Sequence, residues 1–379
     1  MDLRGKKTLI VVISDLVTDQ RVHRTAVTLR SEGAVVTVVG RRLPDSQSPG
    51  LRAYRTVRFQ LPFVKGPFMY AAFNMRLFFY LLFHPFELIV ANDLDTLPAA
   101  YLASRIKRKK LLYDSHEYFT EVPELSGRPR VQRFWQRIER MIFPRLKAVM
   151  TVNESIARLY REQYGKQVHV VRNIPLTDTF GDQDIFVTKS RADFALPEDR
   201  TIFLLQGAGI NMHRGAEEAV EAMRYVDHAL LLLVGGGDVI DQLKRTVTES
   251  KLEDKVRFLP KMAPAALRKL TRLADFGLTL DKPTNLNYRY SLPNKLFDYI
   301  HAGLPVIASD LPEIRRIVDE YGIGILLPSV DPNVIADTMN RLVKGDPAVA
   351  GWKENLKKAS DSLTWEHERA RLLEALKDV

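Results

Sequence analysis

Short apolar runs alternate with amphipathic segments along the 379-residue chain, and this alternation occurs in two consecutive series. Strands that alternate with helical segments favour a parallel sheet with crossover helices. The first series predicts strands at Thr8–Ser14, Val35–Val39, Glu87–Ala91, Lys110–Tyr113, Ala148–Val152 and Val168–Arg172. The second series predicts strands at Ile202–Gln206, Ala229–Val234, Val256–Leu259, Phe276–Leu280, Pro305–Ala308 and Gly324–Leu327. The sequence therefore predicts two α/β domains in tandem.

The chain length and the breaks in periodicity set the expected domain boundaries. A chain of 379 residues is too long for one ordinary hydrophobic core and fits two domains. Helices are expected at Val22–Ser31, Thr96–Ile106, Val131–Ile142, Glu154–Tyr164, Ala216–Met223 and Trp352–Lys377. The stretch from Asn173 to Arg200 lacks clear periodicity and indicates a linker. We therefore expect domains at 1–175 and 201–350, a linker at 176–200 and a C-terminal helical segment at 351–379.

Charge is distributed unevenly along the chain. Residues 1–172 contain 29 Lys and Arg against 15 Asp and Glu, a net charge of +14, and the remainder contains 27 against 31, a net charge of −4. A basic first half suits an anionic partner, such as a membrane surface, a nucleic acid or an acidic acceptor, or else forms a solvated basic face. No aromatic–basic module stands out, so a nucleic-acid partner is not expected.

Several classes of site are excluded by composition and motif. The chain has no cysteine, which excludes disulfides, thiolate catalysis and Cys-based zinc sites and suits a reducing compartment. Its eight histidines show no metal-ligand spacing, and neither a G-x-x-x-x-G-K-[ST] loop nor a G-x-S-x-G elbow occurs. The apolar run Leu9–Ile13 is too short for a signal-peptide core. We expect a cytoplasmic protein that binds no metal.

The most apolar region lies between Phe63 and Val90. Lys65, Asn74 and Arg76 interrupt it, and His84-Pro85 closes it before the ~20 apolar residues of a membrane span accumulate. Its aromatic residues and basic flanks suit a helix at a membrane interface. The same pattern suits a helix buried against the first sheet, and one helix can do both.

The segment from Ser291 to Ala308 joins a polar loop, a helix and an apolar strand. A helix N-terminus offers free backbone N–H groups and a positive dipole end, which suit a phosphate. Asn294 and Lys295 open this helix, and Lys295 would add a full charge. Asp298 would provide a carboxylate that can accept hydrogen bonds from a ribose diol. An ordinary strand–helix junction that ends at Gly303 is the alternative.

At these residues the sequence resembles the retaining glycosyltransferases of family 4, which have the GT-B fold of two Rossmann-like domains facing across a cleft. The donor-site helix of that family reads roughly Glu-x7-Glu-Ala-x-Ala-x-Gly-x-Pro-Val. Counting back from Gly303 puts Asp298 at the second Glu, which holds the ribose hydroxyls in the family. The first Glu, which contacts the donor sugar or its phosphates, falls at Tyr290. This departure leaves the sugar open. A Ser/Thr-Trp pair near the end of family members starts a helix that returns to the first domain, and Thr364-Trp365 matches it.

Three further donor-binding candidates lie in the second half. Gly209 and Arg214 occupy the loop from Gln206 to Gly215, where glycine permits close approach to an anion and arginine can bind phosphate as a fork. The resemblance puts Arg214 on the donor diphosphate together with Lys295, and Lys261 near the nucleotide base. A solvent-exposed side chain is the alternative for Arg214 and Lys261. The Gly235–Gly237 run lacks the third glycine of a dinucleotide fingerprint, because Ile240 stands there, and it indicates a tight strand-to-helix turn.

In the first half the candidates lie at the carboxyl ends of predicted strands, where parallel sheets bind ligands. Asp93 follows one strand, and His116 and Glu117 follow another. The resemblance implies that His116 lies near the transferred sugar, and we name His116, Asp93 and Glu117 as catalytic candidates. A buried histidine that orients a loop is the alternative. Asp19 and Arg21 are candidates for the acceptor side, and Asp19 is equally suited to cap a helix.

The expected function is transfer of a sugar from a nucleotide-diphosphate sugar to an acceptor, with retention of configuration. The resemblance implies front-face substitution, in which the donor phosphate takes the acceptor proton and the protein acts by position and electrostatics. A lipid-linked or membrane-surface glycan is the expected acceptor, with peripheral contact to the inner face of the membrane through the basic first domain.

Two other functions use the same fold. A nucleotide-sugar epimerase would need extra acids in the site, for which Asp93, Asp114 and Glu117 are the candidates, and it would release nucleotide without an acceptor product. A non-catalytic scaffold would bind no nucleotide sugar.

Overall fold

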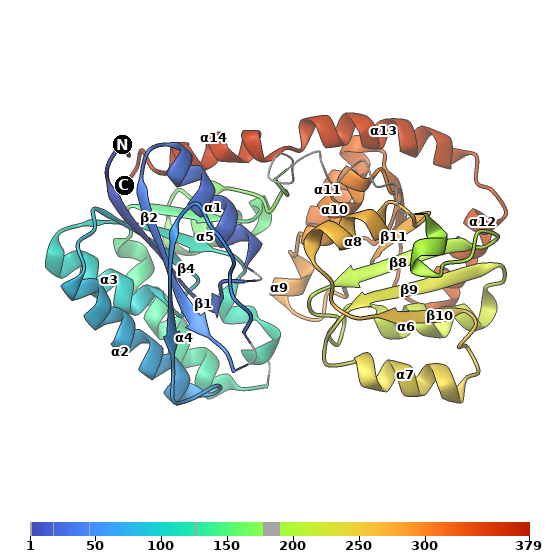
Figure 1. The fold of residues 1–379 in the computed structure, drawn as a ribbon, viewed down its shortest axis with the longest axis horizontal. Helices are drawn as coiled ribbons and strands as arrows, with labels where there is room; N and C mark the ends of the chain where they lie inside the picture. Colours follow the sequence, from blue (N-terminus) through green and yellow to red (C-terminus); the bar gives the residue numbers. More distant parts are fainter. Residues whose placement is uncertain (1, 18, 45, 126, 177–189) are drawn as a thin grey trace. The chain divides into compact units, whose positions relative to one another are not determined.

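In the computed structural model, residues 2–17, 19–44, 46–125, 127–176 and 190–379 are described, and they divide into two compact units (Figure 1). Unit 1 comprises Met1–Arg172 and Glu366–Val379, and unit 2 comprises Asn173–Trp365. Most of the expected linker, residues 177–189, lies outside the described residues. Each unit is an α/β domain with its own sheet, as the alternating pattern predicts.

A parallel sheet forms the centre of unit 1. Its strands, within the described residues, are β1 Lys7–Asp15, β2 Val35–Arg42, β3 Arg55–Gln60, β4 Leu88–Asn92, β5 Lys110–Ser115, β6 Ala148–Thr151 and β7 His169–Val170. They lie in the order β3-β2-β1-β4-β5-β6-β7, and each neighbouring pair is parallel. The β3 strand was missed by the sequence prediction, because it is a half-exposed edge strand whose polar residues hide the apolar signal.

Helices cover both faces of this sheet. They are α1 Gln20–Ser31, α2 Pro67–Phe83, α3 Leu97–Lys107, α4 Pro129–Ile142, α5 Glu154–Tyr164 and α14 Trp365–Ala375. Local chemistry explains where α5 begins and ends. The backbone N–H of Ile156 donates to Asn153 Oδ1 at 2.9 Å, and Gly165 ends the helix with a φ of 62°.

Unit 2 contains a second parallel sheet. Its described strands are β8 Thr201–Gly207, β9 Ala229–Gly235, β10 Val256–Leu259, β11 Phe276–Thr279, β12 Val306–Ser309 and β13 Gly324–Leu327, in the order β10-β9-β8-β11-β12-β13. Its helices are α6 Ala216–Ala222, α7 Ile240–Glu249, α8 Pro264–Thr271, α9 Leu286–Arg289, α10 Asn294–Ala302, α11 Pro312–Tyr321, α12 Pro332–Val343 and α13 Ala348–Ser362.

The core of unit 2 lies on both faces of its sheet. Successive residues of β8 point to opposite faces, so Phe203 and Leu205 join one buried cluster while Ile202 and Leu204 join the other. The first cluster packs under α6, α7 and α12, and the second under α10, α11 and α13. A strand buried on both faces reads as a continuous apolar run, which explains why these strands were predictable.

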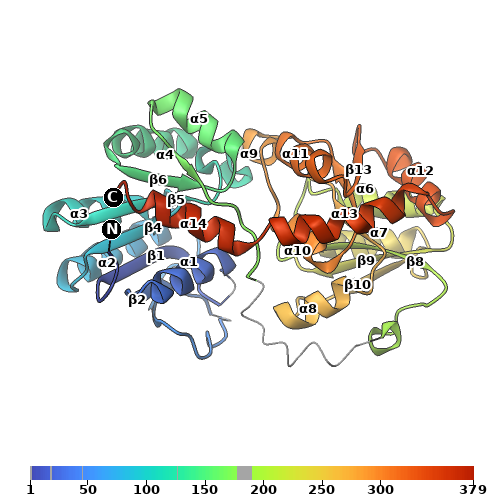
Figure 2. The same ribbon diagram turned by 90° about the horizontal axis from the view of Figure 1, so that it is seen from above.

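The C-terminal segment is divided between the two units, which corrects the expectation that 351–379 packs on the first domain as one piece. The α13 helix runs beside α10 and α11 in unit 2, with Leu356 and Ala359 in its core (Figure 2). The α14 helix belongs to unit 1, where Glu368 is fully buried and accepts from Arg172, with Arg172 Nη2 and Glu368 Oε1 2.7 Å apart. Only the last helix therefore returns to the first domain.

Candidate functional site

Both sheets have a switch point, where strand order reverses and ligands bind beyond the carboxyl ends of the strands. In unit 1 this point lies between β1 and β4, and in unit 2 it lies between β8 and β11. Asp93 follows β4, and the loop from Gly207 to Gly215 follows β8. Asp93 and the loop that carries Gly209 and Arg214 therefore lie at these switch points.

In unit 1, Arg21 and Asp114 form a buried ion pair beside the switch point. Arg21 Nε donates to both carboxylate oxygens of Asp114 at 3.1 and 2.9 Å, and Arg21 Nη1 donates to the carbonyl of Val171 at 2.7 Å. The Arg21 side chain is 4% exposed and that of Asp114 is 0% exposed. We therefore correct the expectation that Arg21 meets the acceptor, because its charge is buried and neutralised inside unit 1.

His116 joins this ion pair to the β4 end. Its Nε2 lies 2.9 Å from Asn92 Oδ1 and 3.4 Å from Asp114 Oδ2, and its Nδ1 lies 3.3 Å from Asp93 Oδ2. Burial favours a lower pKa, but the carboxylates of Asp93 and Asp114 outweigh it and raise the pKa of His116 to about 9. The imidazole is therefore protonated at neutral pH and acts as a hydrogen-bond donor rather than as a base.

Asp93 is held in a backbone conformation that few side chains adopt. Its φ is 61°, and one carboxylate oxygen accepts from the backbone N–H of His116 at 2.8 Å. Short polar side chains such as aspartate tolerate this left-handed region, and such residues concentrate at functional sites. Burial raises the pKa of Asp93, while protonated His116 favours its charged form.

The other first-half candidates have more local roles. Asp19 caps α1, since the backbone N–H of Val22 donates to Asp19 Oδ1 at 3.0 Å. This contact agrees with the second of the two roles that the sequence left open for Asp19, that of a helix cap. Glu117 is half-buried, and its carbonyl accepts from the Ser115 hydroxyl at 2.7 Å. Asn92 was not predicted as a site residue and Asp114 only for the epimerase alternative, although both lie at the ends of parallel strands, and that position was the available signal.

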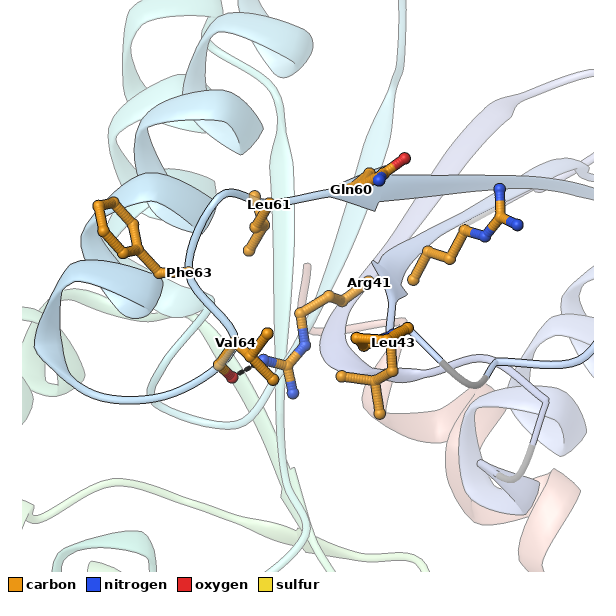
Figure 3. Close-up of a pocket in the computed structure, with 8 residues that line it drawn as sticks. Arg41, Leu43, Gln60, Leu61, Phe63 and Val64 are labelled. Carbon is orange, nitrogen blue, oxygen red and sulfur yellow. Dashed lines mark hydrogen bonds between the residues drawn. The ribbon is translucent and has the colours of Figure 1, made fainter.

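A small hollow lies at the carboxyl ends of β2 and β3, on the same edge of the sheet. It has a volume of about 210 Å³ and is lined by Arg41, Arg42, Leu43, Pro44, Gln60, Leu61, Phe63 and Val64 (Figure 3). Arg41 Nη1 donates to the carbonyl of Val64 at 2.9 Å, and buried Arg41 Nε has no hydrogen-bond partner among the described residues. The hollow thus combines guanidinium groups with apolar walls.

In unit 2, Arg214 pairs with a buried carboxylate, Asp281, and the charges of both residues act on Lys295. Arg214 Nη1 lies 3.1 Å from Asp281 Oδ1, and Asp281 is 0% exposed. Burial lowers the pKa of Lys295, Asp281 opposes this effect, and the positive charge of Arg214 adds to it. The described contacts thus pair Asp281 with Arg214, and Lys295 lies within electrostatic reach of both. Asp281 was missed, although it follows a predicted strand closely.

The first turn of α10 surrounds Lys295. Its N-cap, Pro293, supplies no side-chain hydrogen bond, and Asn294 is exposed at the first helical position. The buried hydroxyl of Ser291 has no partner among the described residues. One turn further on, Asp298 Oδ2 accepts from Gln206 Nε2 at 3.2 Å, which links α10 to the end of β8. Cationic, backbone N–H and carboxylate groups therefore lie within one helical turn.

Glycines allow two loops of unit 2 to pack tightly. A Cβ on Gly235, whose φ is 138°, would lie 1.8 Å from the carbonyl oxygen of Gly207, and one on Gly237 would lie 2.0 Å from that of Ile210. The backbone N–H of Ile210 donates to the Gly236 carbonyl at 2.7 Å. The predicted tight turn after β9 is therefore present, and it shapes the loop that carries Gly209.

The remaining second-half candidates lie around this loop. Gly209 is exposed, and the exposed Lys261 lies over Gly236, where a Cβ on the glycine would be 2.9 Å from Lys261 Cε. Arg214 stacks over Tyr288, with its guanidinium carbon 4.7 Å from the ring centroid. Tyr290, at the position where the family carries its first Glu, is half-buried at the end of α9.

Among the described residues, no group of three or more His, Cys, Asp or Glu side chains is arranged to hold a metal ion. In the same part of the chain, no helix is long and apolar enough to cross a membrane.

Two family models match the chain and together extend over both units. The model described as "Glycosyl transferase 4-like domain" matches residues 18–174, and "Glycosyl transferases group 1" matches residues 186–359. With the two parallel-sheet domains, these matches define the class. The chain belongs to the group 1 glycosyltransferases of the GT-B fold, as the sequence predicted, and it is similar to family 4.

Curated relatives are distant. The chain is 22% identical over 255 residues to the amylovoran biosynthesis glycosyltransferase AmsK of Erwinia amylovora, covering 66% of this chain and 60% of the relative. It is 24% identical over 230 residues to a D-inositol 3-phosphate glycosyltransferase of Xylanimonas cellulosilytica, covering 58% of this chain and 53% of the relative. The matches thus span less than two thirds of these relatives.

Solved structures share the fold over nearly the whole chain. Sucrose-phosphate synthase of Thermosynechococcus elongatus superimposes with a TM-score of 0.77 at 19% identity, covering 98% of both chains. Anabaena HepE, solved in complex with UDP and glucose, gives a TM-score of 0.76 at 16% identity, covering 99% of this chain and 100% of that one. WaaG, a glycosyltransferase involved in lipopolysaccharide biosynthesis, gives 0.68 at 15% identity, covering 96% and 98%. These similarities establish the GT-B fold.

Proposed function

We propose that this protein transfers a sugar from a nucleotide-diphosphate sugar to an acceptor. The observation that carries the proposal is the grouping of Arg214, Lys295 and the first turn of α10 at the switch point of unit 2. Two cations and free helix N–H groups suit a diphosphate, and they can stabilise the charge that develops on the leaving nucleotide without a metal. The complex of the structural relative HepE with UDP supports this choice of ligand.

Asp298 would bind the ribose in this proposal. Its carboxylate lies one turn after Lys295 on α10, beside Gln206, and a ribose diol can donate two hydrogen bonds to a carboxylate. Gly209 and Lys261 would line the nucleotide from the neighbouring loops. The sugar and the base stay open, since Tyr290 replaces the family's first Glu.

Retention of configuration is part of the proposal, and the contacts of unit 1 support it. Asp114 is engaged by Arg21 and His116, and Asp93 is engaged by His116, so neither carboxylate is presented as a nucleophile or base. Protonated His116 can donate hydrogen bonds but cannot take a proton. The acceptor proton would then pass to the donor phosphate, as the family resemblance implies. The same engagement disfavours the epimerase alternative, which needs free acids.

The acceptor we propose is a glycan linked to a lipid at a membrane surface. The hollow of Arg41, Arg42 and the apolar side chains of Leu61 and Phe63 suits a molecule that carries both an anionic and an apolar part. The net charge of residues 1–172 supports an anionic partner.

Thermal stabilisation by a panel of nucleotides and nucleotide sugars tests the donor site. A ligand at ~100 times its dissociation constant adds about 2.7 kcal/mol to the free energy of unfolding. We expect a shift with one nucleotide family that is lost in Lys295→Ala and Asp298→Ala. The matched control is Lys282→Ala, because Lys282 forms an ion pair with Glu218 and is not a candidate for binding the donor. No shift with any nucleotide would reject the proposal in favour of a scaffold.

Analysis of the product tests the finer proposals. The anomeric configuration of the linkage, determined by NMR, is expected to match that of the donor, and an inverted product would reject retention. Release of free nucleotide without an acceptor product would favour the epimerase.

A further inference from the structure

The α2 helix is apolar on both its inner and its outer side. Met69, Phe73, Leu77 and Leu81 recur every four residues and are buried in unit 1. The opposite stripe is exposed, and it begins with Phe68, whose exposed fraction is 69%. A helix of a soluble domain ordinarily has a polar outer side, so the exposed stripe requires its own explanation.

The outer stripe of α2 continues along the helix. Met75, Phe79 and Phe83 follow Phe68 at spacings of seven, four and four residues, which keeps them on one side of the helix. Their exposed fractions are 62%, 50% and 80%. A contiguous patch of large, solvent-exposed apolar side chains indicates a binding surface, whereas single exposed apolar residues are ordinary.

The neighbouring helices extend this apolar area. The α2 helix packs along α3, and α3 contacts α4, so the three helices gather on one side of unit 1 (Figure 1). Lys107 of α3 donates from Nζ to three carbonyls at the end of α2, including His84 O at 2.7 Å, which fixes the two helices together. Leu102 and Ile106 on α3 are more than half exposed. We call the outer sides of these helices the α2–α3–α4 surface.

The α4 helix adds basic residues to the surface. Val131, Phe134 and Met141 are exposed on it, interleaved with the exposed side chains of Arg130, Arg133, Arg137 and Arg140. The single acid of α4, Glu139, points inward, where it is 1% exposed and accepts from the Tyr164 hydroxyl at 2.6 Å. The outer side of α4 therefore carries no negative charge.

Charge has the same sign across the whole surface. Neither α2 nor α3 contains an acidic residue, and the segment Arg105–Lys110 contains five Lys and Arg. Aromatic and aliphatic side chains interleaved with Lys and Arg are the composition by which helices lie in the interface of an anionic membrane. A second copy of this chain would bring two basic surfaces together, which like-charge repulsion opposes.

We propose that the α2–α3–α4 surface docks unit 1 on an anionic lipid bilayer. The apolar side chains enter the boundary between headgroups and acyl chains, and the arginines bind the lipid phosphates. This deepens the membrane-surface part of the proposed function, and its test requires neither donor nor acceptor. The Arg41 hollow adjoins this surface, because Phe63 and Val64 line it immediately before α2.

Vesicle flotation of the full chain tests the proposal. We expect binding to vesicles of equal parts phosphatidylcholine and phosphatidylglycerol, little binding to phosphatidylcholine alone, and loss of binding at high salt because the Debye length shortens. Phe79→Ser with Phe83→Ser, and separately Arg133→Glu with Arg137→Glu, should each weaken binding by at least roughly tenfold.

Two control variants carry matched changes on unit 2. Lys357→Glu with Lys358→Glu reverses two exposed charges on α13, and Tyr225→Ser removes a side chain that is 57% exposed. Both should bind vesicles like the wild type. Melting curves check that every variant is folded.

Three outcomes would overturn the proposal. The first is that the wild type does not bind anionic vesicles. The second is that the α2 and α4 variants bind as well as the wild type. The third is that light scattering reveals a dimer, without any vesicle binding, that Phe79→Ser with Phe83→Ser dissociates. Lys295→Ala should keep vesicle binding while it loses nucleotide binding, which separates this proposal from the donor site.

Discussion

Arg21 Nη2 and Asp114 Oδ1 lie 2.6 Å apart although the two residues are 93 positions apart in the chain. Through this contact and the bond from Arg21 to the Val171 carbonyl, α1, β5 and the end of the first sheet are joined beneath the switch point. The ion pair therefore fixes the position of Asp114, whose carboxylate also contacts His116.

Replacing Arg21 by alanine is expected to destabilise the protein strongly. Removing Arg21 breaks a buried ion pair, which typically costs about 3–5 kcal/mol, and it leaves the buried carboxylate of Asp114 with His116 as its cationic partner. The control is Arg158→Ala, whose ion pair with Glu162 is mostly exposed and is worth roughly 0–1 kcal/mol. Urea unfolding of the full chain measures both. Wild-type stability in Arg21→Ala with loss of transfer alone would restore Arg21 as an acceptor contact.

The protonated state of His116 predicts a loss of stability at alkaline pH. Its pKa is raised from 6.5 to about 9 in the folded protein, so the stabilisation is complete below pH 6.5 and is lost as pH rises through 9. The shift corresponds to about 3 kcal/mol. The advantage of the wild type over His116→Gln in unfolding free energy should shrink by up to this amount. An NMR titration that gives a pKa near 6.5 for His116 would contradict the prediction.

Glu139 predicts a second and separate pH dependence. Burial raises its pKa from 4.5 to about 7, against the lowering effect of the hydrogen bond from Tyr164. As pH rises from 4.5 to 7, Glu139 loses its proton in the unfolded chain before it does so in the folded protein. The free energy of unfolding therefore falls across this window by up to about 3 kcal/mol. Glu139→Gln should therefore stabilise the protein at pH 8 and change it little at pH 4.5. The exposed Glu162→Gln is the control, and an equal gain there would contradict the prediction.

A methyl group on Gly237 is expected to damage the donor site. Its Cβ would lie 2.0 Å from the Ile210 carbonyl oxygen, so the loop after β8 must shift. Overpacking of this kind typically costs about 1–3 kcal/mol, and nucleotide-induced stabilisation should fall with it. The control is Gly351→Ala on α13, where the space is open and alanine is the better helix former. Unchanged nucleotide binding in Gly237→Ala would separate this loop from the donor.

The sequence determined the two α/β domains and supplied the candidate site residues, which stay predictions. Strands such as Ile202–Gln206 were readable because a strand buried on both faces is a continuous apolar run. Asp93 and Lys295 were predicted because parallel sheets place ligands at strand ends and helix N-termini bind anions. The edge strand Arg55–Gln60 was missed, since its half-exposed side chains carry no clear period.

Only the tertiary structure decided which charges meet. Two examples are whether Arg21 is exposed to a ligand or paired with Asp114, and whether Arg214 pairs with Asp281. Both depend on contacts between residues far apart in the chain. The sequence left α2 open between a buried and an interfacial helix, and the structure gives it one buried and one exposed apolar stripe. Local pattern records the periodicity of a segment, whereas burial and ion pairing are set by packing between segments, which no short stretch of sequence contains.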